Sequence, residues 1–248
     1  NFSAMSETTF RFREFTVHQE KCAMKVGTDA VLLGSWINPG NAINILDIGT
    51  GTGVIALMLA QQSTAVVDAI DIDEGAYQQA RENFRISPWF MRMAVERISL
   101  QDFVKTYPNR YDIIVSNPPY FHNASKPSTE SRLNARHATA LSFEDLSMGV
   151  KQLLKPGGRF YVILPKQEGL EFMDIAQSNG LFCYRMARVR TVAAKDEKRL
   201  LMEFRDYPGV LSTEEIIIQN DDHTFSDQYI KLTKPFYIQL RIVPPLPQ

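Results

Sequence analysis

The sequence predicts a doubly wound α/β fold, with a mostly parallel sheet of seven strands in which the last strand is antiparallel. Short β-branched runs alternate with helical patterns, which is typical of a sheet wound with crossover helices. A cluster of glycines follows the first run, as in folds that bind a ligand at the carboxyl ends of their strands. The length of 248 residues suits one large domain.

The predicted elements follow one another in a regular order. The strands, each a short apolar run bounded by turn residues, are expected at 43–48, 66–71, 91–95, 111–116, 159–164, 182–191 and 199–205. The helices between them are expected at 54–62, 74–84, 144–154 and 167–178. Residues 121–141 are polar and aperiodic, and they predict a long loop that is a binding element, a lid or disordered. The segment 214–240 is expected to add a short strand and a helix.

Composition excludes several classes of protein. The hydrophobic share of 44% and the charged share of 22% are typical of a globular chain. No run approaches the roughly 18 apolar residues of a membrane-spanning helix, and the first residues lack the order of a secretory signal. We therefore expect a cytoplasmic protein that has no membrane partner. Cys22 and Cys183 match no metal-ligand spacing, and no metal is expected. A monomer is expected.

The charge is small overall but uneven. The chain carries a net charge of −1, which is weak support for a nucleic-acid partner. Between Phe121 and Arg205 there are 14 Lys and Arg against 9 Asp and Glu, a local net charge of +5. Taken alone, this surplus is also typical of a solvated surface.

The glycine cluster points to a cofactor. The candidate residues are Asp47, Gly49, Thr50, Gly51 and Gly53. The order G-x-G-x-G departs from the G-x-G-x-x-G of nicotinamide binders, and a carboxylate at Asp47 would repel a pyrophosphate but suit a cationic ammonium or sulfonium. The pattern therefore favours S-adenosyl-L-methionine, with a tight turn that binds nothing as the alternative.

Acidic residues after the second and third strands are further candidates. Asp71, followed by Ile72, ends the second strand about 20 residues beyond the glycines, where related folds place an acid on the ribose hydroxyls. Asp73 is the competing candidate, and we assign it to helix capping instead. Asp102 could accept from the adenine amine of the cofactor or cap the next helix, and both readings stay open.

The most informative motif is Asn117-Pro118-Pro119-Tyr120 at the end of the fourth strand. An exocyclic amine is a poor nucleophile because its lone pair is delocalised into the ring. The Asn117 side-chain oxygen and the Pro118 carbonyl could accept both amine hydrogens, Pro119 would stiffen the corner, and Tyr120 would stack on an unpaired base. The alternative is a loop terminator with an exposed tyrosine. This chemistry needs no general base, so His122 and His137 have no required role.

Together these residues resemble the N6-adenine class of Rossmann-like methyltransferases. The wider text is similar to the bacterial tRNA (adenine-N6) methyltransferases that act on the purine next to the anticodon of valine tRNA. The stretches that carry this likeness are Cys22–Asp29, Leu32–Trp36, Ser87–Trp89, Ser116–Tyr120 and Phe236-Tyr237.

The resemblance implies an enzyme, its cofactor and its substrate. It places Lys25, Gly27, Thr28 and Asp29 over the methionine half of the cofactor, although a Thr-Asp pair before a helix is equally an N-cap. It divides the chain into residues 1–42, which cover the cofactor site, a methyltransferase core at 43–206 and an extension of the same domain at 207–248. For a tRNA partner, the basic residues expected to hold phosphates are Lys126, Arg132, Arg136, Arg188, Arg190, Lys195, Lys198 and Arg199.

Three alternatives remain open, and one is a nicotinamide oxidoreductase, against which the glycine spacing argues. Glutamine-N5 protein methyltransferases that act on release factors share the Asn-Pro-Pro-Tyr corner, but they usually carry a helical domain ahead of the core, for which the residues before 43 leave little room. A non-catalytic cofactor-binding module is the third alternative, and the presence of Asn117 and Tyr120 argues against it.

Overall fold

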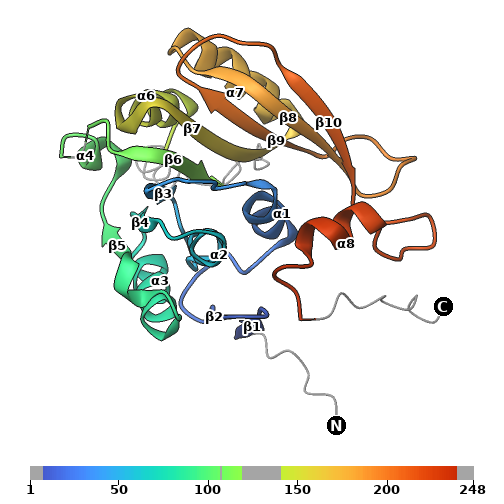
Figure 1. The fold of residues 1–248 in the computed structure, drawn as a ribbon, viewed down its shortest axis with the longest axis horizontal. Helices are drawn as coiled ribbons and strands as arrows, with labels where there is room; N and C mark the ends of the chain where they lie inside the picture. Colours follow the sequence, from blue (N-terminus) through green and yellow to red (C-terminus); the bar gives the residue numbers. More distant parts are fainter. Residues whose placement is uncertain (1–7, 107, 119–140, 239–248) are drawn as a thin grey trace, which may run out of the picture.

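The chain forms one large sheet with helices on both faces and a small hairpin beside it (Figure 1). The structure, a computed structural model, describes residues 8–106, 108–118 and 141–238. The sheet has eight strands in the order β10-β8-β9-β7-β6-β3-β4-β5. The strands of the sheet are β3 Asn44–Ile48, β4 Val66–Asp71, β5 Met93–Arg97, β6 Tyr111–Ser116, β7 Leu154–Pro165, β8 Phe182–Arg190, β9 Arg199–Arg205 and β10 Ser212–Ile217. The hairpin pairs β1 Thr9–Arg11 with β2 Thr16–His18.

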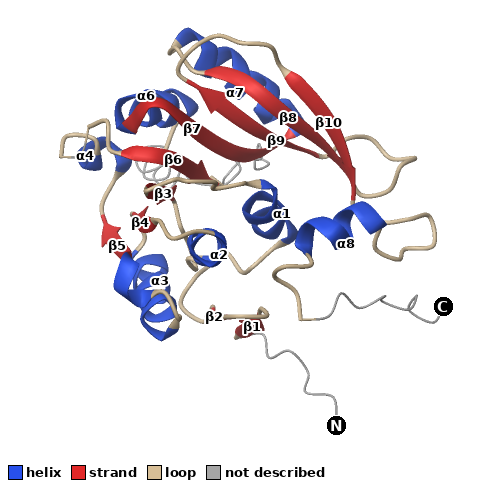
Figure 2. Ribbon diagram, in the orientation of Figure 1, coloured by secondary structure: helices blue, strands red, loops and turns tan. Residues whose placement is uncertain are grey.

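Helices cover the two faces of the sheet in separate groups (Figure 2). One group comprises α1 Thr28–Trp36, α2 Val54–Gln62, α3 Glu74–Ile86 and the last helix, α8 Asp227–Thr233. The other group comprises α4 Leu100–Phe103, α6 Phe143–Leu153 and α7 Lys166–Ser178, and a short 3₁₀ helix, η1 Phe90–Arg92, precedes β5. Among the described residues, no helix is long and apolar enough to cross a membrane.

The predicted fold class is confirmed. The seven expected strands are β3 to β9, and β9 runs antiparallel to both of its neighbours, β7 and β8. The structure adds an eighth strand, β10, which pairs in parallel with β8 at the edge of the sheet. The strand expected in 214–240 therefore extends the main sheet. The first four residues of β10, 212–215, are exposed and polar. The sequence therefore has no apolar run at this point that would predict a strand of the main sheet.

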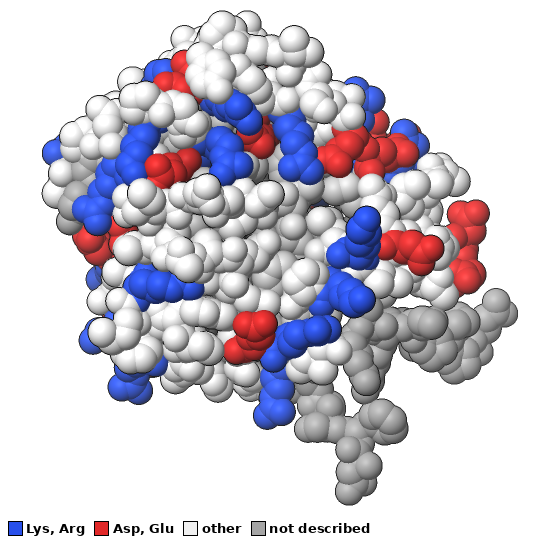
Figure 3. All heavy atoms as spheres, in the orientation of Figure 1, with Lys and Arg blue, Asp and Glu red and all other residues white. Residues whose placement is uncertain are grey.

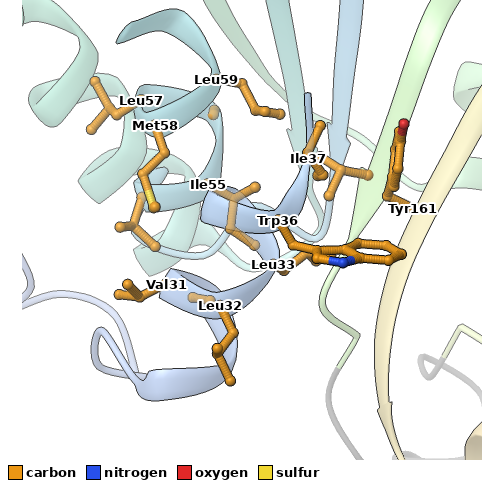
Figure 4. Close-up of a cluster of buried hydrophobic side chains, with 14 of the residues drawn as sticks. Val31, Leu32, Leu33, Trp36, Ile37, Ile55, Leu57, Met58, Leu59 and Tyr161 are labelled. Atoms are coloured by element: carbon orange, nitrogen blue, oxygen red, sulfur yellow. The ribbon is translucent and has the colours of Figure 1, made fainter. Parts of the chain in front are cut away.

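The core beneath α1 and α2 is tightly packed. Figure 4 shows Trp36 of α1 lying across Tyr161 of β7, with ring centroids 5.9 Å apart and planes at 88°. Val31, Leu32 and Leu33 of α1 belong to the same buried cluster as Ile55 and Met58 of α2. This packing holds the amino ends of α1 and α2 beside each other at the carboxyl edge of the sheet.

The carboxyl ends of seven strands lie at that edge, because β9 alone runs antiparallel to the rest of the large sheet. β3, β4, β6 and β7 run parallel, so the segments that follow them emerge on one side. The connection between β8 and β9 lies there too, because β9 is antiparallel and its first residue, Arg199, pairs with Pro165 at the end of β7. The glycine loop, Asn117 and the basic connection 191–198 are thus brought to the same edge.

Candidate active site

The glycine loop connects β3 to α2 and is held against the end of β4. The backbone N–H groups of Gly49 and Thr50 both donate to the Ile70 carbonyl, at 2.9 and 3.1 Å. Gly49 has a φ of +70°, in the left-handed region that favours glycine, and a Cβ built there would meet no atom within 4 Å. The loop therefore leaves open space above Gly49 that a ligand could fill.

Asp47 lies beneath this loop at the end of β3. Its side chain is buried, with 1% exposed, and Oδ2 accepts a hydrogen bond of 2.7 Å from Thr50 Oγ1. Among the described residues, Oδ1 has no hydrogen-bond partner. Burial raises the pKa of Asp47 to about 7, although the bond from Thr50 lowers it. A buried carboxylate with one unpaired oxygen is stabilised in its charged form by a nearby positive charge. This environment is consistent with the prediction that Asp47 favours a cationic ligand.

Asp71 is the last residue of β4, Asp73 follows the strand, and the two carboxylates have different partners. The Asp71 carboxylate accepts from the backbone N–H groups of Gly51, at 2.9 Å, and of Asp73, at 3.0 Å. Burial raises the pKa of Asp71. Asp73 is the N-cap of α3 and accepts from Ala76 N at 2.8 Å, as predicted. Asp71 thus lies directly beside the glycine loop, and its ribose role stays a prediction.

A cavity of about 310 Å³ opens above the glycine loop. One wall is the start of α1 with the residues before it, the other is the glycine loop with the start of α2, and Asn117 lies at their junction. Eight of the residues singled out from the sequence line it, namely Lys25, Gly27, Thr28, Asp29, Gly49, Thr50, Gly51 and Asn117. The sequence reasoning missed Met24, Ala30, Thr52, Val54 and Ile55, which also line it. Asp47, Gly53, Asp71, Ile72 and Asp102 lie outside the lining.

The start of α1 corrects one reading of the sequence. The N-cap is Gly27, without a side-chain cap, and Thr28 and Asp29 are the first two helical residues, so the Thr-Asp pair does not supply a capping side chain. Asp29 Oδ2 instead accepts a hydrogen bond of 2.9 Å from Arg199 Nε. This ion pair joins the cavity wall to the first residue of β9.

Asn117 and Pro118 follow β6 directly beside the end of β3. Ile48 and Ser116 are paired in the sheet, and Ser116 Oγ donates to the Ile48 carbonyl at 2.9 Å. Asn117 is half-buried and lines the cavity. The predicted meeting of the glycine loop with the Asn-Pro corner is therefore present. Pro119 and Tyr120, and with them His122, His137, Lys126, Arg132 and Arg136, lie outside the described residues.

Asp102 is exposed in the first turn of α4. The N-cap of that helix is Ser99, whose Oγ accepts from Asp102 N and donates to Asp102 Oδ2. A hydrogen bond from Lys105 lowers the pKa of Asp102. Of the two readings left open for Asp102, the one in which it is the capping residue is therefore excluded, because Ser99 occupies the N-cap position. Its adenine role stays a prediction.

The basic residues predicted around β8 and β9 lie at the same edge as the cavity. Arg188 and Arg190 approach Glu197 at 3.6 and 3.7 Å, and Lys166, which the sequence reasoning missed, pairs with it at 2.9 Å. The hydrogen bond from Lys166 lowers the pKa of Glu197. Lys195 and Lys198 are exposed. On the face drawn in Figure 3, basic side chains are interspersed with acidic ones.

Comparison with known proteins gives the methyltransferase class that the sequence resemblance predicted. The family model described as "Methyltransferase small domain" matches residues 22–182. A curated relative from Bacteroides fragilis is 46% identical over 95% of this chain and 100% of its own length, and one from Trichodesmium erythraeum is 43% identical with the same coverage. Both are named tRNA1(Val) (adenine(37)-N6)-methyltransferase. A solved structure of a predicted O-methyltransferase from Agrobacterium tumefaciens superimposes with a TM-score of 0.67 at 19% identity, covering 87% of this chain and 100% of that one.

The wound sheet, the glycine loop and the cavity at its carboxyl edge define a Rossmann-like methyltransferase. The chain belongs to the methyltransferase small domain family and, within it, to the group formed by these two curated relatives.

Proposed function

We propose that the chain transfers a methyl group from S-adenosyl-L-methionine to the exocyclic N6 of an adenine in the anticodon loop of a valine tRNA. The relatives named as tRNA1(Val) (adenine(37)-N6)-methyltransferases support this substrate. The observation that carries the proposal is the single cavity lined both by the glycine loop and by Asn117, because a methyl donor and an amine must meet in one place.

The residues around the cavity fit this cofactor. The open space above Gly49 admits a ligand close to the backbone, and the buried Asp47 carboxylate below it favours a positive charge nearby. We assign cofactor binding to Lys25, Gly27, Thr28, Asp29, Asp47, Gly49, Thr50, Gly51, Gly53, Asp71, Ile72, Asp102 and Asn117. When bound, the cofactor supplies an electrophilic methyl group.

The chain supplies orientation for the acceptor. Asn117 directly follows β6 and lines the cavity, and Pro118 comes next, with its φ fixed by the proline ring. The Asn117 amide oxygen and the Pro118 carbonyl are the acceptors we assign to the two amine hydrogens, with Pro119 and Tyr120 completing the corner. Hydrogen bonds in place before the reaction favour a pyramidal nitrogen and need no reorganisation during methyl transfer.

Methylation of unmodified transcripts tests the proposal. Purified protein, labelled S-adenosyl-L-methionine and a valine tRNA transcript should give label in N6-methyladenosine, located by mass spectrometry of nuclease fragments. A second reaction with a release factor in place of RNA tests the glutamine-N5 alternative. Label in the protein and none in the RNA would overturn the adenine assignment, and no label in either would favour a binding module.

The glycine loop allows a matched test of cofactor binding. Gly49 has a φ of +70° and Gly157, near the start of β7, has a φ of +76°, and a Cβ on either meets no atom within 4 Å. Alanine at each should therefore cost a similar 1–2 kcal/mol, about the strain of a left-handed residue. Only Gly49→Ala places a methyl group in the cavity, so calorimetry should show adenosylhomocysteine binding weakened about tenfold or more in that variant alone. Equal binding by both variants would remove Gly49 from the site.

The basic residues at the cavity edge are proposed to hold phosphates, but their roles differ. Arg190 pairs with Glu215 at 2.7 Å and donates to the carbonyls of Ala193 and Lys195, so part of its work is to fix the β8–β9 connection. Arg199 pairs with Asp29. Because Lys195 and Lys198 are exposed on this connection, we expect the phosphate contacts to depend on them most.

Removing both exposed lysines should weaken RNA binding without affecting the cofactor. Lys195→Ala/Lys198→Ala is expected to raise the KM for tRNA and to lower the slope of log affinity against log salt by up to about 2, since each phosphate contact contributes about 1. Arg81→Ala/Arg85→Ala, which removes two exposed cations from α3, is the control with the same change in charge. If both double variants show the same salt slope, the β8–β9 connection is not the phosphate surface.

We further propose that the protein acts as a cytoplasmic monomer of one domain. Residues 1–42 cover the cofactor site, 43–206 form the core and 207–248 extend it. The described residues of one chain supply both walls of the cavity, so the cavity needs no residue from a second copy. Phe12 and Phe236 belong to the same buried cluster as Ile55, which supports a single domain.

A further inference from the structure

The two walls of the cavity come from distant parts of the chain. One wall is the glycine loop. The other includes Met24, Lys25 and Gly27 from residues 19–27, which run from β2 to α1 and are named here the covering segment. The shape of the cavity therefore depends on what holds the covering segment against the glycine loop.

Asn83 of α3 forms hydrogen bonds both to the glycine loop and to the residue that precedes the covering segment. Its side chain is fully buried, with 0% exposed. Nδ2 donates to the Thr52 carbonyl in the glycine loop and to the His18 carbonyl, both at 2.8 Å, and Oδ1 accepts from His18 N at 2.9 Å. His18 ends β2 immediately before the covering segment. One amide thus joins the glycine loop to the point where the covering segment begins.

Two residues at helical spacing from Asn83 extend this contact along α3. Gln79, also 0% exposed, accepts from Lys21 N through Oε1 at 2.9 Å. At Gly75 a Cβ would lie 2.4 Å from the Lys21 carbonyl, so the covering segment passes directly against the helix. Because residues four apart share one face of a helix, Gly75, Gln79 and Asn83 form a continuous row under the segment.

The covering segment is also bonded within itself. Gln19 Oε1 accepts from Val26 N at 2.9 Å, and the Gln19 carbonyl accepts from Lys25 Nζ at 2.6 Å. Cys22 faces the glycine loop, with Sγ 3.7 Å from the place of a Cβ on Gly51. The anchored start of the segment therefore determines where Lys25 lies in the cavity wall.

We propose that Asn83 is a positioning residue for the methyl donor, because it fixes the spacing between the two walls of the cofactor cavity. It does not line the cavity itself, so its loss should change affinity for the cofactor and leave the transfer step intact. The proposal rests on the proposed function in taking S-adenosyl-L-methionine as the ligand of this cavity.

Calorimetry with adenosylhomocysteine and steady-state kinetics test it. Asn83→Ala is expected to raise the Kd and the cofactor KM about tenfold or more, with kcat at saturating cofactor within about twofold of the wild type. Gln62→Ala is the matched control, because its amide donates to the Gly34 and Met58 carbonyls without reaching the covering segment. This control should lower the Tm and leave the Kd unchanged.

Gly75→Ala separates positioning from stability. The substitution removes no hydrogen bond and introduces a better helix former, yet its Cβ must displace the Lys21 backbone. It should weaken adenosylhomocysteine binding with a smaller loss of Tm than Asn83→Ala. Wild-type Kd values for both folded variants would overturn the proposal.

Limited proteolysis supplies a readout that does not depend on the ligand. Trypsin can cut after Lys21 and Lys25, and in the ligand-free protein these cuts should be about tenfold faster in Asn83→Ala than in Gln62→Ala. Unchanged cleavage would contradict the anchoring role. If the wild type binds no adenosylhomocysteine, the proposed function fails, and the cleavage rates still decide whether Asn83 holds the segment.

Discussion

Asn117→Ala is expected to lower kcat for tRNA methylation by about 10²–10³-fold, the usual cost of removing one pre-organised hydrogen-bonding group from a reaction centre. The reason is local: Asn117 lies where the end of β6 meets the glycine loop, and its amide oxygen is the side-chain acceptor assigned to the amine. Single-turnover rates with saturating cofactor measure the effect on the transfer step itself.

The split between turnover and affinity is the decisive part of this experiment. Asn117 is one of many residues in the cavity wall, so the Kd for adenosylhomocysteine should change by less than about fivefold, under about 1 kcal/mol. Asn220→Ala, which removes an exposed amide from the loop before α8, is the control and should leave both quantities unchanged. An equal loss of turnover and affinity would show that Asn117 binds the cofactor and has no separate role toward the amine.

The glycine loop and the Asn-Pro corner could be predicted because their signals are local. A β-branched run that ends in glycines or prolines predicts both a strand and the edge at which its ligand residues emerge. The observed bounds of β4, α2, β6 and β9 are the ones predicted from the sequence. The Asn-Pro corner and the glycines then follow strands that the fold places side by side.

The contacts that complete the site could not be predicted from the local sequence. Gln79 and Asn83 are polar residues of an amphipathic helix and would be expected at its surface, yet both are buried under the covering segment. Arg190 and Arg199 stand in a basic stretch, and their partners Glu215 and Asp29 are distant in sequence. Such pairs depend on tertiary packing, to which neither periodicity nor local charge is sensitive.

The second large effect is a pH dependence of stability that depends on Asp47. Its pKa is raised from 3.8 to about 7 in the folded protein, so the folded state binds this proton more tightly than the unfolded state does. The stabilisation that results is complete below about pH 4, decreases as the pH rises, and is lost above about pH 7. Over that range it amounts to about 4 kcal/mol, at 1.36 kcal/mol for each pKa unit.

Asp47→Asn isolates this contribution, because the amide resembles the protonated acid and does not titrate. The free energy of unfolding of the wild type minus that of the variant should become more negative between about pH 4 and 7 and then stay level. Asp112→Asn is a control of opposite sign. Partial burial raises the pKa of Asp112, but hydrogen bonds from Asn44 N and Lys155 outweigh it and the net shift is downward. The free energy of unfolding of the wild type minus that of Asp112→Asn should therefore increase as the pH rises through the acid range.

Cofactor binding should follow from the same carboxylate. S-adenosyl-L-methionine carries a sulfonium and an ammonium group, and a positive charge above the glycine loop favours ionised Asp47. Affinity of the wild type should therefore rise as the pH increases toward about 7, by up to tenfold for each pH unit, and level off above it. In Asp47→Asn the affinity should be lower and lack this dependence. Parallel pH profiles for the two proteins, in stability and in binding, would show that Asp47 is already ionised in mild acid and does not respond to the charge of the cofactor.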